Sequence, residues 1–213
     1  MLDRDGLNQL LREFAIKPDS DEGLKLQAYL SLLKKWNPRV NLTANISWKA
    51  LEPLFREGIW AAAKYPADFR THLDIGSGAG FPALILRVFN ENMELELVES
   101  RGKKCAFLET AAWEMGLKGT RVHTKRLEDL LAKNVPENKT WDCVSWKAIR
   151  LACRDLLRLR RHTNENSKLW MFHGREAAVE DSLTFDAEFI LSEKLPVPEQ
   201  KESFLSIYRA RTP

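Results

Sequence analysis

The chain has 213 residues, of which 44% are hydrophobic and 30% charged, and its formal net charge is +3. This composition argues against disorder, and no segment approaches the roughly 18 consecutive apolar residues that a membrane-spanning helix requires. Cys105, Cys143 and Cys153 lie far apart without CxxC spacing, so we expect neither a disulfide framework nor a metal site. We therefore predict a soluble, monomeric protein of the cytoplasm with reduced thiols.

Residues 1–65 form the predicted helical N-terminal region. Apolar residues recur at helical spacing over 7–14 and again over 24–36. Pro38 and the turn that follows it are expected to end the second helix, because proline disfavours continuation of a helix. A third helix is predicted over 48–64.

Residues 66–213 are predicted to form one Rossmann-like domain. Short apolar runs alternate with amphipathic segments of helical length, which is typical of repeated βα units around a parallel sheet. In chain order the runs are THLDIG, ELELVE, RVHTK, WDCVSW and KLWMFHG. Two further strands, 187–195 and 204–210, are expected as antiparallel additions at a sheet edge. The predicted fold class is α/β, with a mostly parallel sheet and a helical N-terminal extension.

A glycine-rich loop follows the first predicted strand and precedes a helix that begins near Pro82. Its ligand-facing residues are predicted to be Gly76, Ser77, Gly78 and Gly80. Glycine leaves no Cβ to obstruct a ligand that approaches the backbone. A phosphate-binding loop would end in Gly-Lys-Ser/Thr, which is absent here, so a dinucleotide or S-adenosyl-L-methionine (AdoMet) remains. Phe81 stands where the dinucleotide motif has its third glycine, and Glu99 could accept the ribose hydroxyls of either ligand.

The sequence resembles the RsmG (GidB) family of methyltransferases over most of its length. The residues that carry the resemblance are Lys35-Trp36-Asn37 with Asn41-Leu42-Thr43, the loop from Asp74 to Pro82, Val98-Glu99-Ser100 with Lys103, Lys104, Phe107 and Leu108, and Arg126-Leu127-Glu128. Members of this family transfer a methyl group from AdoMet to N7 of a guanine in the 16S RNA of the small ribosomal subunit. The resemblance therefore implies a class I AdoMet-dependent methyltransferase whose partner is ribosomal RNA or the small ribosomal subunit.

The resemblance also implies roles for individual residues at the cofactor site. The backbone at Gly76 and Phe81 would line the methionine and ribose portion of AdoMet, and Glu99 would take the ribose hydroxyls. Leu127 and Glu128 would border the adenine. Lys147 occupies the place of a family arginine near the cofactor.

Several family positions are changed around the expected reaction cleft. Glu57 and Trp60 replace a histidine and an aspartate, and His173 replaces a lysine. These changes leave open a non-catalytic relative that binds AdoMet and RNA. A nicotinamide-dependent oxidoreductase is a further alternative, against which Phe81 argues.

Methyl transfer to guanine N7 requires positioning rather than proton removal, because N7 has a lone pair and carries no proton. Lys147 and His173 close the fourth and fifth predicted strands, where open α/β sheets place their ligands. We predict that these two residues orient the base and are the catalytic residues.

The segment 149–162, IRLACRDLLRLRRH, is predicted to be one helix with a stripe of arginines. Residues 101–170 hold 16 Lys and Arg against 8 Asp and Glu, which suits a surface that meets phosphate. The residues predicted to contact the RNA substrate are Asn41, Arg56, Lys103, Lys104, Arg150, Arg154 and Arg158.

Overall fold

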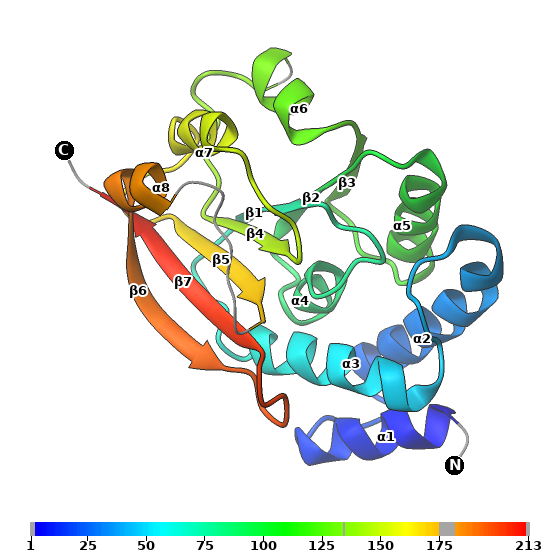
Figure 1. Cartoon of the computed structure of the whole chain (residues 1–213). Helices are drawn as coiled ribbons and strands as arrows, with labels where there is room; N and C mark the ends of the chain where they lie inside the picture. The colour runs from blue at the N-terminus through cyan, green and yellow to red at the C-terminus, as the bar shows by residue number, and fades with distance from the viewer. Residues whose placement is uncertain (1–2, 134, 175–181, 212–213) are drawn as a thin grey trace.

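The computed structural model describes residues 3–133, 135–174 and 182–211. Its strands form one seven-stranded sheet in the order β3-β2-β1-β4-β5-β7-β6 (Figure 1). The strands are β1 (Thr71–Ile75), β2 (Glu94–Glu99), β3 (Thr120–Thr124), β4 (Cys143–Lys147), β5 (Lys168–His173), β6 (Phe189–Pro196) and β7 (Phe204–Ala210). The five apolar runs of the sequence thus become the five parallel strands, and the α/β fold class is confirmed.

Helices cover both faces of the sheet (Figure 1). They are α1 (Asp3–Glu13), α2 (Asp21–Val40), α3 (Trp48–Ala62), α4 (Ala83–Phe89), α5 (Gly102–Glu114), α6 (Leu127–Lys133), α7 (Cys153–Arg160) and α8 (Ser182–Glu188). The first five pack in one hydrophobic core and the last three in another. Both faces of the sheet centre are therefore buried, which is why β1, β4 and β5 have nearly continuous apolar sequences.

Neighbouring residues of the central strands divide between these two cores. Cys143 and Trp170 belong to the core of α1 to α5, whereas Val144, Leu169 and Met171 belong to the core of α6 to α8. This division follows from the two-residue period of a strand, whose successive side chains point to opposite faces.

The C-terminal hairpin differs in detail from the expected pair of edge strands. β7 lies inside the sheet, antiparallel to both β5 and β6. β6, at the edge, therefore runs in the same direction as the five parallel strands. Residues 187 and 188 end α8 instead of beginning the strand.

The second helix extends two residues beyond Pro38, where it was expected to end. α2 includes Pro38 in its last turn and closes at Asn41, which adopts a left-handed conformation with φ of 52°. The side chain of Asn37 then fixes the following turn, since it both donates to and accepts from the backbone of Thr43, at 3.1 and 2.8 Å. The family-like segment 35–43 is thus a helix end with its own cap.

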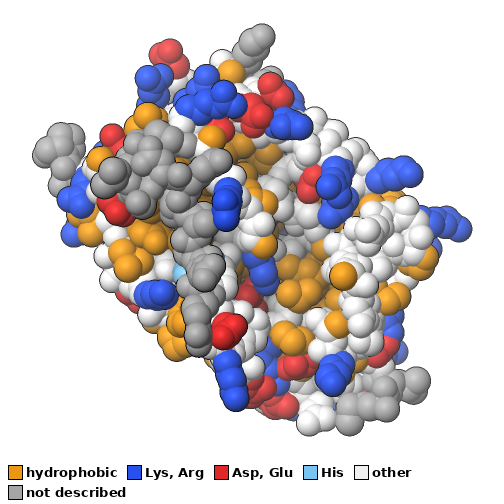
Figure 2. Space-filling model, in the orientation of Figure 1, with side chains coloured by type: hydrophobic (Ala, Val, Ile, Leu, Met, Phe, Trp, Pro, Cys, Tyr) orange, Lys and Arg blue, Asp and Glu red, His pale blue; other side chains and the backbone are white. Residues whose placement is uncertain are grey.

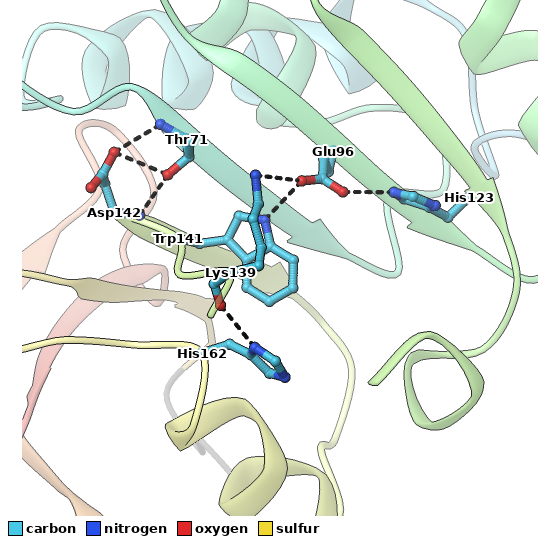
Figure 3. A network of polar contacts seen from close by, with 7 residues as sticks. All are labelled: Thr71, Glu96, His123, Lys139, Trp141, Asp142 and His162. Carbon is cyan, nitrogen blue, oxygen red and sulfur yellow. Dashed lines mark hydrogen bonds and ion pairs between the residues drawn. The ribbon is translucent and has the colours of Figure 1, made fainter. Parts of the chain in front are cut away.

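A polar network ties the segment that precedes β4 to β1, β2 and β3 (Figure 3). One Glu96 oxygen accepts a hydrogen bond from Trp141 and lies 3.2 Å from Lys139, and the other lies 2.8 Å from the His123 ring. Burial alone would raise the pKa of Glu96, but the contacts with His123, Trp141 and Lys139 lower it to about 2. The start of β4 is therefore held in place, and with it the residues at its far end.

Candidate active site

The glycine loop reverses the chain between β1 and α4 in a left-handed backbone. Gly76, Gly78 and Gly80 have φ values of 70°, 55° and 92°. A Cβ on Gly80 would lie within 2.4 Å of the Leu84 side chain, so this glycine is needed for packing. A Cβ on Gly78 would meet nothing closer than 3.7 Å, so the loop presents open backbone at this point.

Glu99, at the end of β2, is tied to this loop. One of its carboxylate oxygens accepts from the Gly78 N–H at 3.0 Å and the other from the Arg101 N–H at 2.8 Å. The carboxylate is therefore fixed beside the loop, and each oxygen keeps a lone pair for a further donor.

A cavity of about 340 Å³ lies at the carboxyl ends of β1, β2 and β3. Four of the predicted cofactor residues line it, namely Gly76, Glu99, Leu127 and Glu128. Ser77, Gly78, Gly80 and Phe81 form the adjacent loop without lining this cavity, and the Phe81 ring packs against Tyr29 and Phe55 instead. The structure thus brings together the residues predicted from three separate parts of the chain.

Asp155 also lines this cavity. From the sequence alone it is interpreted only as a negative charge that offsets the neighbouring arginines of the helix. It is buried, and burial raises the pKa of its carboxyl, against the nearby charge of Arg154. A buried carboxyl beside Glu128 gives this end of the cavity a polar wall. No local sequence signal indicated that α7 would turn Asp155 towards the ends of β2 and β3.

A second cavity of about 420 Å³ lies beside the first, at the ends of β4 and β5. Both predicted catalytic residues, Lys147 and His173, line it, and so does Glu57 from α3. Ile149 and Arg150 line both cavities, so the segment between β4 and α7 forms the wall that they share.

Lys147 is paired with Glu57 at a distance of 2.5 Å between Nζ and Oε1. The Glu57 side chain is only 3% exposed, whereas that of Lys147 is 27% exposed. The buried carboxylate thus holds an ammonium group that is partly open to the cavity. Ala148 follows with a positive φ of 55°, which turns the chain sharply after Lys147.

His173, which also lines this cavity, is held as a neutral ring. Its Nδ1 lies 2.6 Å from the Gly174 carbonyl oxygen and its Nε2 lies 2.8 Å from the Ser206 hydroxyl. A carbonyl can only accept, so Nδ1 carries the proton and Nε2 accepts from Ser206 in the neutral ring. Burial lowers the pKa of His173, which agrees with this neutral form.

A buried polar row at the ends of β1 and β4 was not predicted from the sequence. Ser145 donates to Asp74 Oδ1 at 2.6 Å, and its hydroxyl oxygen lies 2.8 Å from His72 Nε2. The second oxygen of Asp74 is buried without a hydrogen bond. Burial raises the pKa of Asp74 to about 7 and lowers that of His72 to about 3.

The predicted RNA-contacting arginines do not form one helical stripe. α7 begins at Cys153, so Arg150 lies in the preceding segment and lines both cavities. Arg154 and Arg158 remain on the helix, with side chains 71% and 43% exposed. The predicted helix over 149–162 therefore began four residues too early and ended two residues too late, and its first residues instead form the segment between β4 and α7.

The other predicted RNA-contacting residues occupy separate places. Arg56 lines neither cavity and is paired with three carboxylates, those of Glu13, Glu52 and Glu199. Lys103 and Lys104 lie in the first turn of α5, and Lys104 Nζ lies 4.0 Å from the position of a Cβ on Gly78. Asn41 is an exposed cap of α2.

Fold and site together define a class of protein. The sheet has this strand order with one antiparallel strand, and the glycine loop after β1 faces a carboxylate at the end of β2. This arrangement is the fold of class I AdoMet-dependent methyltransferases. A solved SAM-dependent methyltransferase from Aquifex aeolicus superimposes with a TM-score of 0.60 at 16% identity, covering 86% of this chain and 98% of that one. MtNAS in complex with S-adenosylmethionine gives a TM-score of 0.61 at 12% identity, with 89% and 76% of the two chains covered.

The sequence comparisons identify the family. The family model described as rRNA small subunit methyltransferase G (GidB) matches residues 23–203, so the chain belongs to this family. The ribosomal RNA small subunit methyltransferase G of Rhodospirillum centenum is 41% identical over 105 residues, which are 49% of this chain and 48% of that protein. The protein of the same name from Paracoccus denitrificans is 28% identical over 164 residues, 76% and 82% of the two chains.

The matches differ in how much of each relative they include. The chain spans about half the length of several curated relatives that it matches, such as that of Rhodospirillum centenum at 48%.

Among the described residues, no helix is both long and apolar enough to cross a membrane.

Proposed function

We propose that the protein transfers a methyl group from AdoMet to N7 of a guanine in 16S ribosomal RNA of the small subunit. The observation that carries this proposal is the pair of adjoining cavities that share the wall formed by Ile149 and Arg150. Four of the predicted cofactor residues line one cavity, and both predicted base-orienting residues line the other. Methyl transfer needs two such sites side by side, because the donor and acceptor must approach in line.

The residues of the first cavity fit AdoMet. Gly78 keeps the backbone of the adjacent loop accessible, and the fixed Glu99 carboxylate can accept from two ribose hydroxyls. Leu127 offers an apolar contact for the adenine, with Glu128 and Asp155 as polar neighbours. Bound AdoMet would supply an electrophilic methyl group on its sulfonium.

The residues of the second cavity would orient the base. Lys147 can donate a hydrogen bond to guanine O6, next to N7, and would in this way orient the base for attack. The neutral His173 ring contributes a flat wall rather than a proton acceptor, since its Nδ1 proton and its Nε2 lone pair are both used within the protein. No residue needs to remove a proton from N7, so a proton acceptor at the base is not required.

The RNA-facing surface is proposed to include the start of α5 and α7. Figure 2 shows basic side chains over α5, on the right of this face, with few acidic ones between them. Lys103 and Lys104 belong to α5, and Arg154 and Arg158 are partly exposed on α7. Exposed cations of this kind bind RNA phosphates and position the strand without reading its sequence. A contact of Arg56 with RNA would require one of its three carboxylate partners to be released.

The test is transfer of labelled methyl from AdoMet to intact small subunits and to naked 16S RNA that lacks the modification. Mass-spectrometric mapping of the product should give a single N7-methylguanosine. Methylation of another atom or of protein alone would overturn the proposal.

Two alternative functions predict other outcomes, which this transfer assay and a binding assay distinguish. A non-catalytic relative would bind AdoMet and RNA but leave both substrates unmethylated, and the replacement of the family histidine by Glu57 favours this alternative. An oxidoreductase would instead bind a nicotinamide dinucleotide and not AdoMet, which equilibrium binding with both labelled ligands distinguishes.

A further inference from the structure

The ion pair of Glu57 and Lys147 forms one wall of the second cavity. Glu57 comes from α3 and Lys147 from the end of β4, 90 residues apart in the chain. The Glu57 carboxylate is 3% exposed, and the Lys147 ammonium group lies 2.5 Å from it. Placing such a pair in a low-dielectric wall costs desolvation free energy, and hydrophobic residues of similar volume would often be more stable there. The pair is therefore better explained by recognition than by stability.

The neighbouring Arg56 does not compete with a ligand for Glu57, because it is paired with other carboxylates. Arg56, next to Glu57 in sequence, is directed towards the carboxylates of Glu13, Glu52 and Glu199. Gln200 donates to the Pro53 carbonyl oxygen at 2.9 Å, which ties the turn between β6 and β7 to α3 along the cavity. The cavity thus has a built polar wall, made of one carboxylate and one ammonium group at a fixed separation.

The buried Glu57 carboxylate makes this wall a poor contact for a phosphate, even though Arg150 is a second cation among the residues that line the cavity. A phosphate would be attracted by Lys147 but repelled by the buried negative charge of Glu57. A neutral group that has an acceptor beside donors satisfies both residues. Guanine has this pattern along one edge, with O6 as acceptor followed by the N1–H and the N2 amino group as donors.

We propose that Glu57 and Lys147 together read this edge of the target guanine. Lys147 donates to O6, while the Glu57 carboxylate accepts from N1–H and from the N2 amino group and also holds Lys147 in position. Guanine is the base with two adjacent donors beside an acceptor, whereas uracil would direct its second carbonyl oxygen at the carboxylate. This inference rests on the proposed function and adds the groups that select the base.

The test uses inosine, which lacks only the N2 amino group of guanine. Once the target position is mapped, the 16S RNA is prepared with guanine or inosine at that position, and kcat/KM for methyl transfer is measured on each. The wild-type protein should lose about tenfold or more on inosine, as expected for loss of one well-placed contact to a base edge. Glu57→Gln should lose a similar factor on guanine and show no further loss on inosine.

Glu52→Gln is the matched control, since Glu52 lies on the same helix but pairs with Arg56 and does not line the cavity. It should keep the full inosine penalty. Labelled AdoMet binding reports that each variant is folded.

The possible outcomes are distinguishable. Equal rates of the wild-type protein on guanine and inosine would overturn the inference, whether or not Glu57→Gln folds. An unchanged inosine penalty in a folded Glu57→Gln protein would also overturn it. If the wild-type protein methylates no RNA at all, the proposed function fails instead.

Discussion

The stability of the protein should fall as pH rises through neutrality, because of one carboxyl group. Asp74 is buried at the end of β1 with one oxygen bonded to Ser145 and the other without a partner. Burial raises its pKa from the ordinary value of 3.8 to about 7, against the lowering effect of the hydrogen bond from Ser145. The folded protein therefore keeps this proton over a pH range in which the unfolded chain has lost it.

The sign and size of the effect follow from that difference. Stability from this group is fully present below about pH 4 and is lost as pH rises through about 7. The whole shift corresponds to about 4 kcal/mol, of which about 2 to 3 kcal/mol falls between pH 5 and pH 8.5. Asp74→Asn keeps an oxygen that can accept from Ser145 but cannot ionise, so its stability should match the wild type at pH 5 and exceed it at pH 8.5.

Urea unfolding at a series of pH values measures this directly, because titrations of all other groups cancel in the difference between the two proteins. Ser145→Ala removes the hydrogen bond that lowers the pKa, so its fall in stability should occur at higher pH. Parallel pH profiles of the wild type and Asp74→Asn would refute the reasoning.

Three further predictions concern the loop, the polar network and the RNA surface. Gly78→Val places a β-branched residue at a φ of 55°, at a strain of about 1 to 2 kcal/mol, and should abolish binding of labelled AdoMet in a folded protein. Wild-type affinity in this variant would show that AdoMet does not bind against this loop. The charge of Glu96 contributes stability above about pH 4.5, and this contribution is lost as pH falls through about 2. Glu96→Gln should therefore lower the free energy of unfolding at neutral pH by about 1 to 3 kcal/mol and weaken its dependence on acid pH. An unchanged acid-unfolding profile would contradict this. Reversal of Arg154 and Arg158 to glutamate should weaken RNA binding and reduce its salt slope by about 1 to 2, with AdoMet affinity unchanged; a slope like that of the wild type would exclude α7 from the RNA surface.

The local parts of the fold could be predicted from the sequence. The runs of β1, β4 and β5 give a nearly continuous apolar signal because both faces of these strands are buried, whereas β3 at the sheet edge has no buried residue. The glycine loop and Glu99 could also be predicted, since backbone freedom and a carboxylate at a strand end are visible in a short stretch of sequence. The structure joins them by a hydrogen bond at Gly78, and their role in binding AdoMet stays a prediction.

The parts that failed or were missed depend on contacts between distant segments. The predicted helix over 149–162 began too early, because residues 149–152 have helical periodicity but are used as the wall between the cavities. The pairing of Glu57 with Lys147 has no local signal, since each residue alone is only a charge in an unusual place. The protonation of Asp74 likewise depends on burial, which its neighbours in sequence do not reveal.

The hydroxyl of Tyr29 in α2 donates to the carbonyl oxygen of Ala79, 50 residues away in the glycine loop, at a distance of 2.5 Å. Burial raises the pKa of this phenol, so the group remains a donor throughout the working range of the protein. The shape of the loop is consequently maintained from outside the sheet. A shortened protein that starts at β1 would keep every glycine of the loop and still lose this buried support, leaving Ala79 without its partner. The N-terminal helices are in this sense part of the cofactor site, and cutting the chain before β1 would not yield an independent catalytic unit.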